Sequence, residues 1–388
     1  MKIKFYLKNF IFEIFSLFPI HENEILFESN SEMKDNSKSL FQECIFQGIN
    51  KRYKLIWLVD DPKKYYNEYK DITNVFFIKK NKNNSFSLKY LYHSCVAKYC
   101  FYTHIYIGNR KRKGQRKIFL THGVPIKDSR GLFWNPYNNT DIISTSEYAA
   151  ELRCKTFYGG NDIIRILGFP RNDNLFKKDL MVDKFVNELD CNKFIIWLPT
   201  FKHFNIKSSN RNDYSSEQKN DITLMNDKVL KDINDVLVEN KIKLLIKFHP
   251  AQNLDYVNFS NFSNIITMTN EQLLEKKVDL YSLMAKSSAL ITDYSSVYID
   301  YLLLDKPIAF ELGDYDAYSN GIGFIVDNPL DYMPGVKIKN AKDLKIFIND
   351  IVDGIDDFKL ERNELKKKMH KFCDGKSSNR ILEYFNIK

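Results

Sequence analysis

The feature that most constrains the fold is an alternation between short apolar segments and amphipathic helical stretches, which runs through the chain in two series. Continuous apolar and β-branched segments bounded by turn residues are typical of strands buried on both faces, and helices between them indicate parallel sheets. The first series is EILFES, KLIWLVD, NVFFIK, KIFLT, DIIST and IIRIL, at 24–29, 54–60, 74–79, 117–121, 141–145 and 163–167. The second is KFIIWL, KLLIKF, NIITM, ALITD and PIAFE, at 193–198, 243–248, 264–268, 289–293 and 307–311.

Two such series predict two Rossmann-like, doubly wound α/β domains, for which 388 residues supply enough chain. The seam falls in the charged segment that follows the turn at Gly168-Phe169-Pro170. We therefore expect an N-terminal domain over residues 1–180 and a C-terminal domain over residues 181–388, whose last helix can pack back on the first. Two facing domains of this kind would hold a ligand in an interdomain cleft, at the carboxyl ends of their strands.

The amino-acid composition limits the classes of molecule that the protein is expected to bind. Lys and Arg outnumber Asp and Glu by 58 to 49, and a net charge of +9 fits a nucleotide, a phosphorylated substrate or a lipid surface. The six cysteines are scattered without metal-ligand spacing, so we expect reduced thiols, a cytosolic compartment and no metal. The chain has no G-x-G-x-x-G or P-loop, and its basic run at 110–117 lacks interleaved aromatic residues. Nicotinamide, ATPase and nucleic-acid functions therefore lack their key features.

The first twenty residues leave two interpretations open. Lys2, Lys4 and Lys8 precede an aromatic and aliphatic run, but Glu13 interrupts it and no cleavage site follows, unlike in a signal peptide. The run is also too short to span a bilayer. It fits an amphipathic helix in the membrane interface, or else a first helix packed on its own domain.

Several polar motifs directly follow the expected strands. In the motif THGVPIK, Gly123 and Pro125 shape a tight turn that presents His122 as a candidate general base, while Lys127 could meet a phosphate. Arg171 follows the next turn and could fork onto a phosphate or carboxylate. The alternatives are a structural histidine and an ordinary linking turn with Arg171 in a surface ion pair.

The second series carries strand-end motifs of the same kind. Pro199-Thr200 and Lys247-Phe248-His249 close two of its strands, and the His249 imidazole could protonate or hydrogen-bond a developing phosphate charge. Ser295 and Ser296 join the strand ALITD to a helix whose N-terminus could cradle a phosphate. Asp300, one turn later, could accept a sugar or glycerol hydroxyl. A simple helix cap is the alternative for the serine pair.

The segment LITDYSSVYIDYLLLDKPIAF closely resembles the signature of the CDP-glycerol glycerophosphotransferase family, the teichoic acid primases and polymerases. THGVPIK, GFPRND, LPTFK, KFHP, DLYSLM and a late Pro-Gly resemble further family motifs in the same order, and ILFES followed by Asp35-Asn36 resembles the family's start. The likeness covers nearly the whole chain. It implies a GT-B fold.

The resemblance also implies an activity: an acceptor hydroxyl attacks the β-phosphate of CDP-glycerol and CMP leaves. His122 would be the base and His249 would assist at the phosphate. Other residues would bind the donor. Its pyrophosphate would be held by Arg171, Ser295, Ser296 and Lys247, and its nucleotide or glycerol by Gly123, Pro125, Lys127, Pro199, Thr200, Tyr281, Ser282, Leu283 and Asp300. CDP-glycerol is the donor substrate, and no cofactor is implied.

The expected protein is a cytoplasmic transferase, peripheral on the inner face of the cell membrane, whose acceptor is a lipid-linked surface glycan or polymer. Thr121 and Val124 stand where the teichoic acid enzymes are expected to carry Trp and Thr, and the positions after Lys127 also differ. These residues flank the presumed base, so the acceptor stays open. A GT-B enzyme using CDP-ribitol or a nucleotide sugar in capsule synthesis, and a non-catalytic nucleotide- or polymer-binding member, remain alternatives.

Overall fold

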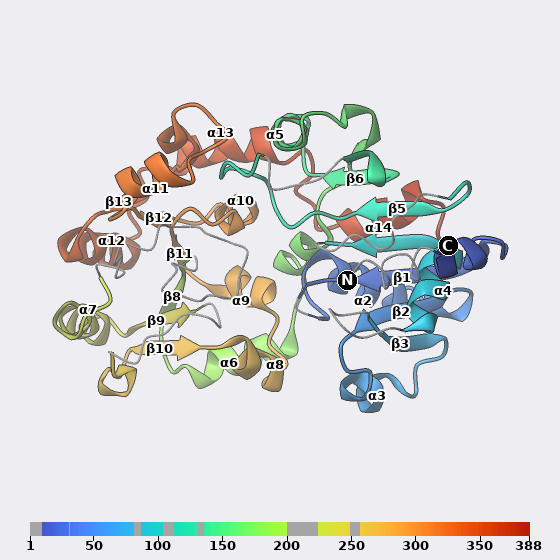
Figure 1. Cartoon of the computed structure of the whole chain (residues 1–388). Coiled ribbons are helices and arrows are strands. Elements are labelled where there is room, and N and C mark those ends of the chain that lie inside the picture. The colour runs from blue at the N-terminus through green and yellow to red at the C-terminus, as the bar shows by residue number, and fades with distance from the viewer. Residues whose placement is uncertain are drawn as a thin grey trace. The chain divides into compact units, whose positions relative to one another are not determined.

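A computed structural model describes residues 10–30, 32–80, 87–103, 112–130, 136–199, 224–248 and 257–388 (Figure 1). The chain divides into two compact units. The first unit comprises Met1–His122, Phe133–Asp173 and Asp374–Lys388, and the second comprises Gly123–Leu132 and Asn174–Cys373. Each unit is built on its own parallel sheet.

The first unit contains a seven-stranded sheet in which all neighbouring strands are parallel. Its strands are β1 (His21–Glu28), β2 (Lys54–Val59), β3 (Val75–Lys79), β4 (Ala97–Tyr102), β5 (Arg116–Phe119), β6 (Asp141–Ser144) and β7 (Ile164–Ile166). They lie in the order β3-β2-β1-β4-β5-β6-β7. The direction of winding changes between β1 and β4, and ligands of such sheets bind beyond the carboxyl ends of the strands at this switch point.

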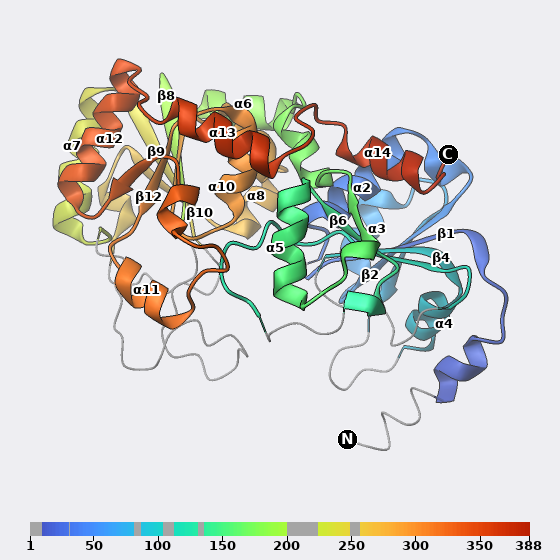
Figure 2. The same ribbon diagram turned by 90° about the horizontal axis from the view of Figure 1, so that it is seen from above.

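Helices cover both faces of this sheet, which explains why its strands are apolar on both sides. They are α2 (Asp35–Phe46), α3 (Lys63–Tyr69), α4 (Leu88–Val96), α5 (Glu147–Phe157) and α14 (Ser377–Tyr384). Figure 2 shows α2 and α14 on one side of the sheet and α4 and α5 on the other. Successive residues of β1 alternate accordingly: the Phe27 ring packs on Phe41 of α2, while Leu26 belongs to a core cluster with Leu91 of α4 and Phe157 of α5.

The second unit contains a six-stranded parallel sheet of the same winding. Its strands are β8 (Lys193–Leu198), β9 (Ile242–Lys247), β10 (Ile265–Met268), β11 (Ala289–Thr292), β12 (Ile308–Glu311) and β13 (Val336–Ile338), in the order β10-β9-β8-β11-β12-β13. The winding changes between β8 and β11, so this unit has its own switch point.

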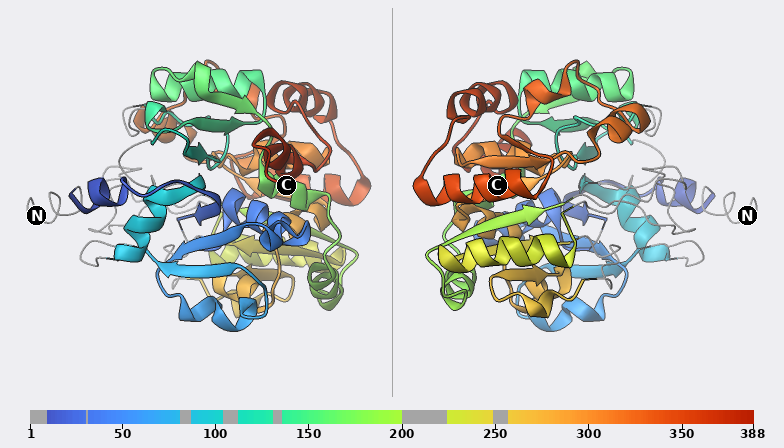
Figure 3. Two further views of the ribbon diagram at one scale, coloured as in Figure 1. Left: turned by 90° about the vertical axis from the view of Figure 1, so that its right-hand side faces the viewer. Right: turned by 90° about the vertical axis from the view of Figure 1, so that its left-hand side faces the viewer.

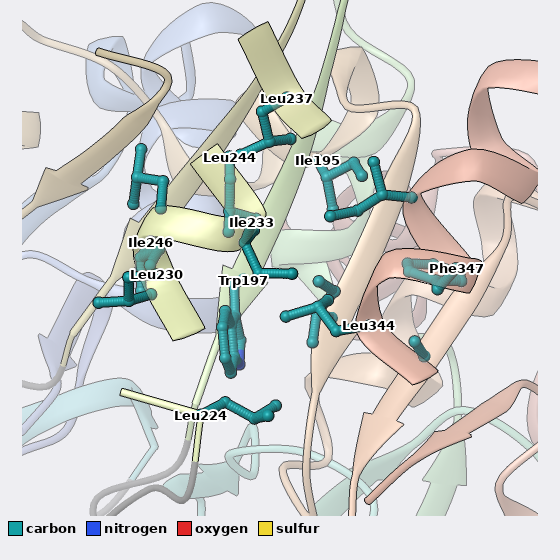
Figure 4. Close-up of a cluster of buried hydrophobic side chains, with 14 of the residues drawn as sticks. Ile195, Trp197, Leu224, Leu230, Ile233, Leu237, Leu244, Ile246, Leu344 and Phe347 are labelled. Carbon is teal, nitrogen blue, oxygen red and sulfur yellow. The ribbon is translucent and has the colours of Figure 1, made fainter. Parts of the chain in front are cut away.

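The helices of the second unit are α6 (Leu180–Glu188), α7 (Asp227–Glu239), α8 (Asn270–Glu275), α9 (Leu280–Lys286), α10 (Val297–Tyr301), α11 (Tyr315–Gly321), α12 (Ala341–Asp353) and α13 (Lys359–Met369). On one face of the sheet, α7 and α12 lie side by side (Figure 3). Their apolar stripes, including Leu230 and Phe347, pack over Trp197 of β8 in a buried hydrophobic cluster (Figure 4). Asn226 and Asn340 begin these two helices by accepting hydrogen bonds from backbone amides of the first turn.

The prediction of two doubly wound parallel-sheet domains is confirmed. Eleven expected strands correspond to strands of the structure, whereas β4 and β13 were not predicted from the apolar pattern. The helix α14 belongs to the first unit, where the Asp173 carboxylate accepts hydrogen bonds from the backbone amides of Ser377 and Ser378, at 2.7 and 2.8 Å. This bond pair holds the C-terminal helix against the turn that follows β7.

Candidate active site

His122 lies three residues beyond the end of β5, close to the carboxyl ends of the strands of the first unit. Left-handed backbone conformations at Thr121 (φ 60°) and Gly123 (φ 128°) turn the chain on either side of it. The imidazole is more than half exposed (57%), so a substrate could reach it. Its Nδ1 lies 2.5 Å from Oδ2 of Asp35.

Asp35 is the first residue of α2, the helix that follows β1 at the switch point. Its backbone is also left-handed (φ 61°), and its carboxylate is only 8% exposed. The second carboxylate oxygen, Oδ1, accepts a hydrogen bond of 2.7 Å from Nη1 of Arg171. One buried carboxylate therefore joins the imidazole of His122 to the guanidinium of Arg171.

Asn36 holds the backbone segments that carry these three side chains. Its Nδ2 donates to the carbonyl oxygens of Leu120 and Thr121, both at 3.1 Å, and its Oδ1 accepts from the Arg171 amide at 3.1 Å. Asn36 is fully buried, and these bonds fix the start of α2 against the end of β5 and the turn after β7. The alternative of Arg171 in a surface ion pair is wrong, because Arg171 is itself buried.

The second unit brings several predicted residues to one edge of its sheet. The strand register sets Ile246 of β9 beside Trp197, and Leu198 beside Thr292 of β11. Lys247 is the last residue of β9, and Pro199 and Asp293 are the next residues beyond the adjoining ends of β8 and β11. The Thr292 hydroxyl donates to the Leu198 carbonyl oxygen at 2.8 Å and ties the two strands together. These positions lie at the switch point of the second sheet.

Ser295 and Ser296 occupy the turn between β11 and α10, and their side chains give little support to the alternative of a simple helix cap. Ser296 is the N-cap residue, yet its side chain makes no capping hydrogen bond. The contact from the Val297 amide to the Ser295 hydroxyl is long, at 3.5 Å. The helix α10 is short, because it gives way to a 3₁₀ turn after Tyr301.

Tyr281 and Asp300 are brought together, because the Tyr281 hydroxyl donates to Asp300 Oδ2 at 2.8 Å. This bond links α9 to α10, and Asp300 is fully buried. The backbone amide of Ser282 donates a hydrogen bond to the Asp279 carboxylate at the start of α9. The Leu283 side chain is buried in the core.

The stretch after His122 belongs to the second unit. Lys127 forms an antiparallel β-bridge with Phe324, and its ammonium lies 5.5 Å from the centroid of the Tyr318 ring. Tyr318 in turn stacks on Tyr294, which directly precedes the serine pair. The loop that carries Gly123 and Pro125 therefore packs, through Lys127, on the aromatic residues Tyr318 and Tyr294 next to Ser295.

Two predicted site residues, Thr200 and His249, lie outside the described residues. Within the described ranges, no group of three or more His, Cys, Asp or Glu side chains could hold a metal ion. A cavity of about 350 Å³ in the first unit is lined by Lys98, Gln115, Arg116 and Tyr384. It lies at the amino ends of β4 and β5, away from the strand ends that carry His122.

Comparison with known proteins identifies the family. A family model described as CDP-glycerol:poly(glycerophosphate) glycerophosphotransferase matches residues 10–386. The chain belongs to this family. The resemblance inferred from the sequence motifs is therefore confirmed.

Relatives in this family differ in the polymer that they are named for. The chain is 25% identical to a teichoic acid poly(glycerol phosphate) polymerase of Bacillus spizizenii, covering 82% of this chain and 81% of the relative. It is 25% identical to a teichoic acid glycerol-phosphate transferase of Staphylococcus aureus, with coverage of 96% and 95%. A teichoic acid poly(ribitol-phosphate) polymerase of B. spizizenii is 26% identical, but the chain spans only 59% of its length.

Among solved structures, the wall teichoic acid polymerase TagF matches with a TM-score of 0.74 over 99% of this chain and 95% of that chain. The two are 22% identical, so the match concerns the fold. The GT-B fold expected for glycerophosphotransferases of this family is confirmed.

Asp35 was not among the residues assigned to the site from the sequence. Its only signal was the pair Asp35-Asn36, which resembles the family's start, at a position shortly after the first apolar strand. An acidic residue beyond the first strand of a doubly wound sheet lies at the switch point, and that rule could have found it.

Proposed function

We propose that the protein transfers glycerol phosphate from CDP-glycerol to a hydroxyl of a cell-surface glycan or polymer and releases CMP. The observation that carries the proposal is the family match over residues 10–386, which includes almost the whole chain. The strand-end positions of His122 and the serine pair support it, because phosphoryl transfer depends on positioned groups and on stabilised phosphate charge. No cofactor is required in this scheme.

The predicted residues other than Arg171 take the following roles in this proposal. His122 accepts the proton of the attacking hydroxyl, and His249 assists at the phosphate. Ser295, Ser296 and Lys247 hold the donor pyrophosphate at the switch point of the second sheet. The nucleotide and glycerol are bound by Gly123, Pro125, Lys127, Pro199, Thr200, Tyr281, Ser282, Leu283 and Asp300, with Leu283 contributing through its backbone because its side chain is buried.

The donor has one specific rival. A relative named for poly(ribitol-phosphate) matches 98% of this chain, so CDP-ribitol is the second candidate donor. The half-buried Tyr281 and the buried Asp300 are the residues that we expect to distinguish the two polyols, because a site that hydrogen-bonds a hydroxyl discriminates strongly against a ligand that leaves its polar groups unsatisfied.

We further propose that the enzyme works in the cytoplasm at the inner membrane surface, on a lipid-linked acceptor. None of the helices in the described part of the chain combines the length and apolar character needed to cross a bilayer. The N-terminal segment is instead attached to the first unit: Arg112 donates to the carbonyl oxygens of Ser16 and Phe18, both at 2.7 Å. It nevertheless exposes Phe10 (63%) and Leu17 (84%), which suits insertion into a lipid interface.

The membrane proposal is tested with liposomes that contain anionic lipid. Replacing Phe10 and Leu17 by Ser should sharply reduce co-sedimentation, whereas Leu360→Ser should not, although Leu360 is exposed to a similar degree on α13. Unchanged binding of the double variant would show that this segment does not bind lipid.

The activity is tested by measuring CMP release from CDP-glycerol, with CDP-ribitol and UDP-sugars as competing donors and a membrane extract as the acceptor. CMP release from CDP-glycerol that disappears in His122→Ala, while donor binding persists, is the expected result. Turnover of another donor alone would overturn the named activity. Donor binding with no release for any acceptor would instead support a non-catalytic binding protein.

A further inference from the structure

The carboxylate of Asp35 is shared between two basic groups in the first unit. One oxygen lies 2.5 Å from Nδ1 of His122 and the other accepts from Arg171 Nη1 at 2.7 Å. Asp35 and Arg171 are each only 8% exposed, whereas His122 is 57% exposed. Because a buried carboxylate needs compensation by charge and hydrogen bonds, the Arg171 contact keeps Asp35 ionised behind a ring that substrates can reach.

We propose that Asp35 is a positioning residue for His122, and that Arg171 acts through Asp35 rather than on the donor pyrophosphate. This inference rests on the proposed transfer reaction, because it assigns how the base of that reaction is oriented. Asp35 accepts the Nδ1 proton of the imidazole, which makes Nε2 the proton-accepting nitrogen. The Arg171 guanidinium neutralises and orients the carboxylate from the other side.

The backbone on which Asp35 and His122 are placed has unusual conformations. Asp35 and Thr121 both adopt left-handed conformations, which are unfavourable above all for a β-branched residue such as Thr121. Asn36 stabilises both segments, because it bonds the Thr121 carbonyl oxygen and the Arg171 amide. Strained residues that are held by a buried amide are typical of sites where side chains must be placed accurately.

His122 and Asp35 have different roles in the proton transfer. As the acceptor oxygen forms its bond to the donor β-phosphorus and the bond from that phosphorus to the CMP oxygen breaks, the hydroxyl proton moves to Nε2 of His122. The resulting imidazolium carries a positive charge that the adjacent Asp35 carboxylate stabilises, while Asp35 itself remains ionised. The proton later leaves to solvent and restores the neutral ring.

The kinetic test compares Asp35→Asn, Arg171→Lys and Arg171→Met. Asp35→Asn should lower kcat by about 10²–10⁴-fold, the range seen when a general base or its orienting carboxylate is lost, with KM and Kd for CDP-glycerol changed by less than about threefold. Arg171→Met should follow the same pattern, and Arg171→Lys should retain more activity because its ammonium can still meet Asp35 Oδ1. A tenfold or greater rise in donor Kd for Arg171→Met, with kcat intact, would overturn the role of Arg171.

The variant Asp173→Asn is a control that distinguishes a general loss of folded structure from a loss of His122 positioning. Asp173 lies in the same turn as Arg171, but its carboxylate holds the amides at the start of α14. This control should lower the melting temperature of the first unit without the selective loss of kcat. If Asp35→Asn changes kcat by less than threefold, or loses activity only in proportion to folded protein, Asp35 does not position the base.

Histidine NMR tests the orientation without any turnover. The chain has seven histidines, so ¹⁵N-histidine labelling with His122→Ala as the assignment control gives a resolvable spectrum. In its neutral form wild-type His122 should carry its proton on Nδ1, and Asp35→Asn should shift the population of neutral rings toward the Nε2-protonated tautomer. An Nε2-protonated ring in the wild type would overturn the inference even if CDP-glycerol is turned over. Failure of the proposed activity would appear instead as an absence of CMP release in the wild type.

Discussion

Gly335 shows how a single missing side chain fixes the packing of two strands. It directly precedes β13, and a Cβ atom placed on it would lie 2.1 Å from the carbonyl oxygen of Ile308 in β12. Backbone cannot move aside as a flexible side chain can, so Gly335→Ala should destabilise the second unit by about 1–3 kcal/mol. Urea denaturation followed by tryptophan fluorescence measures this, because Trp197 is buried in that unit.

Gly321 provides the control for that substitution. It is the last residue of α11, its backbone is not left-handed, and a Cβ there would meet nothing within 4 Å. Gly321→Ala should therefore be neutral or stabilising by up to about 1 kcal/mol, since alanine restricts the unfolded chain. Equal losses of stability in the two variants would contradict the steric explanation for Gly335.

The candidate site was only partly predictable at the scale of residues. His122 and Ser295 were predicted because chemistry-bearing residues that follow apolar strands stand out in the sequence, and the structure places both after strand ends. Asp35 was not assigned, because it meets His122 across 87 residues of chain, and no local pattern encodes such a contact. For the same reason the sequence left the environment of Arg171 open between a ligand contact and a surface ion pair, and only the tertiary fold shows that Arg171 is buried against Asp35.

At the scale of elements, β5 contains a buried lysine that lowers the free energy of unfolding of the first unit. Lys117 is fully buried, and its ammonium lies 6.0 Å from the centroid of the Phe12 ring. Burial lowers the pKa of Lys117 from 10.5 to about 8, which corresponds to ~3 kcal/mol of lost stability while the group is charged. Lys117→Met should therefore raise the melting temperature at pH 7.

The pH dependence of stability shows whether Lys117→Met stabilises the protein by removing a buried charge or only by improving the packing. The unfolded lysine stays protonated up to about pH 10.5, whereas the folded one loses its proton near pH 8, so the wild type gains stability between these values. The advantage of Lys117→Met over the wild type should shrink across that interval in thermal denaturation. Lys113→Met, which changes an exposed lysine, should show no such trend. A constant advantage from pH 7 to pH 10.5 would exclude desolvation as the cause.

Elements were predictable where the chain marks their boundaries. Strands such as β2 and β8 are continuous apolar runs between polar turns, and their predicted bounds agree closely with the structure. The strand β4 was missed because α4 ends at Val96 and β4 begins at Ala97, with no turn residue to separate them. The strand β13 has only three residues, which is too short for a periodic pattern.

At the scale of the whole molecule, the two units should respond differently to acid. Burial lowers the pKa of His370 in the second unit below its usual 6.5, against the opposing effect of its hydrogen bond to the Ile299 carbonyl oxygen. In the first unit burial alone would raise the pKa of Glu24, but the hydrogen bond and charge of His93, aided by His21 and Lys54, bring it below 4.5. The stability of the second unit should therefore begin to fall at a higher pH than the stability of the first unit.

Below pH 6.5 the unfolded second unit takes up a proton at His370 that the folded unit resists, so its stability falls as the pH decreases from that value. The contribution of Glu24 to the first unit is present above pH 4.5 and is lost only as the pH falls further. Hydrogen exchange between pH 7 and pH 4.5 should therefore show protection decreasing earlier in β8 and β11 than in β1 and β2. His370→Gln, which keeps a donor for Ile299, should remove the early decrease, and a variant that loses protection in parallel with the wild type would contradict the assignment to His370.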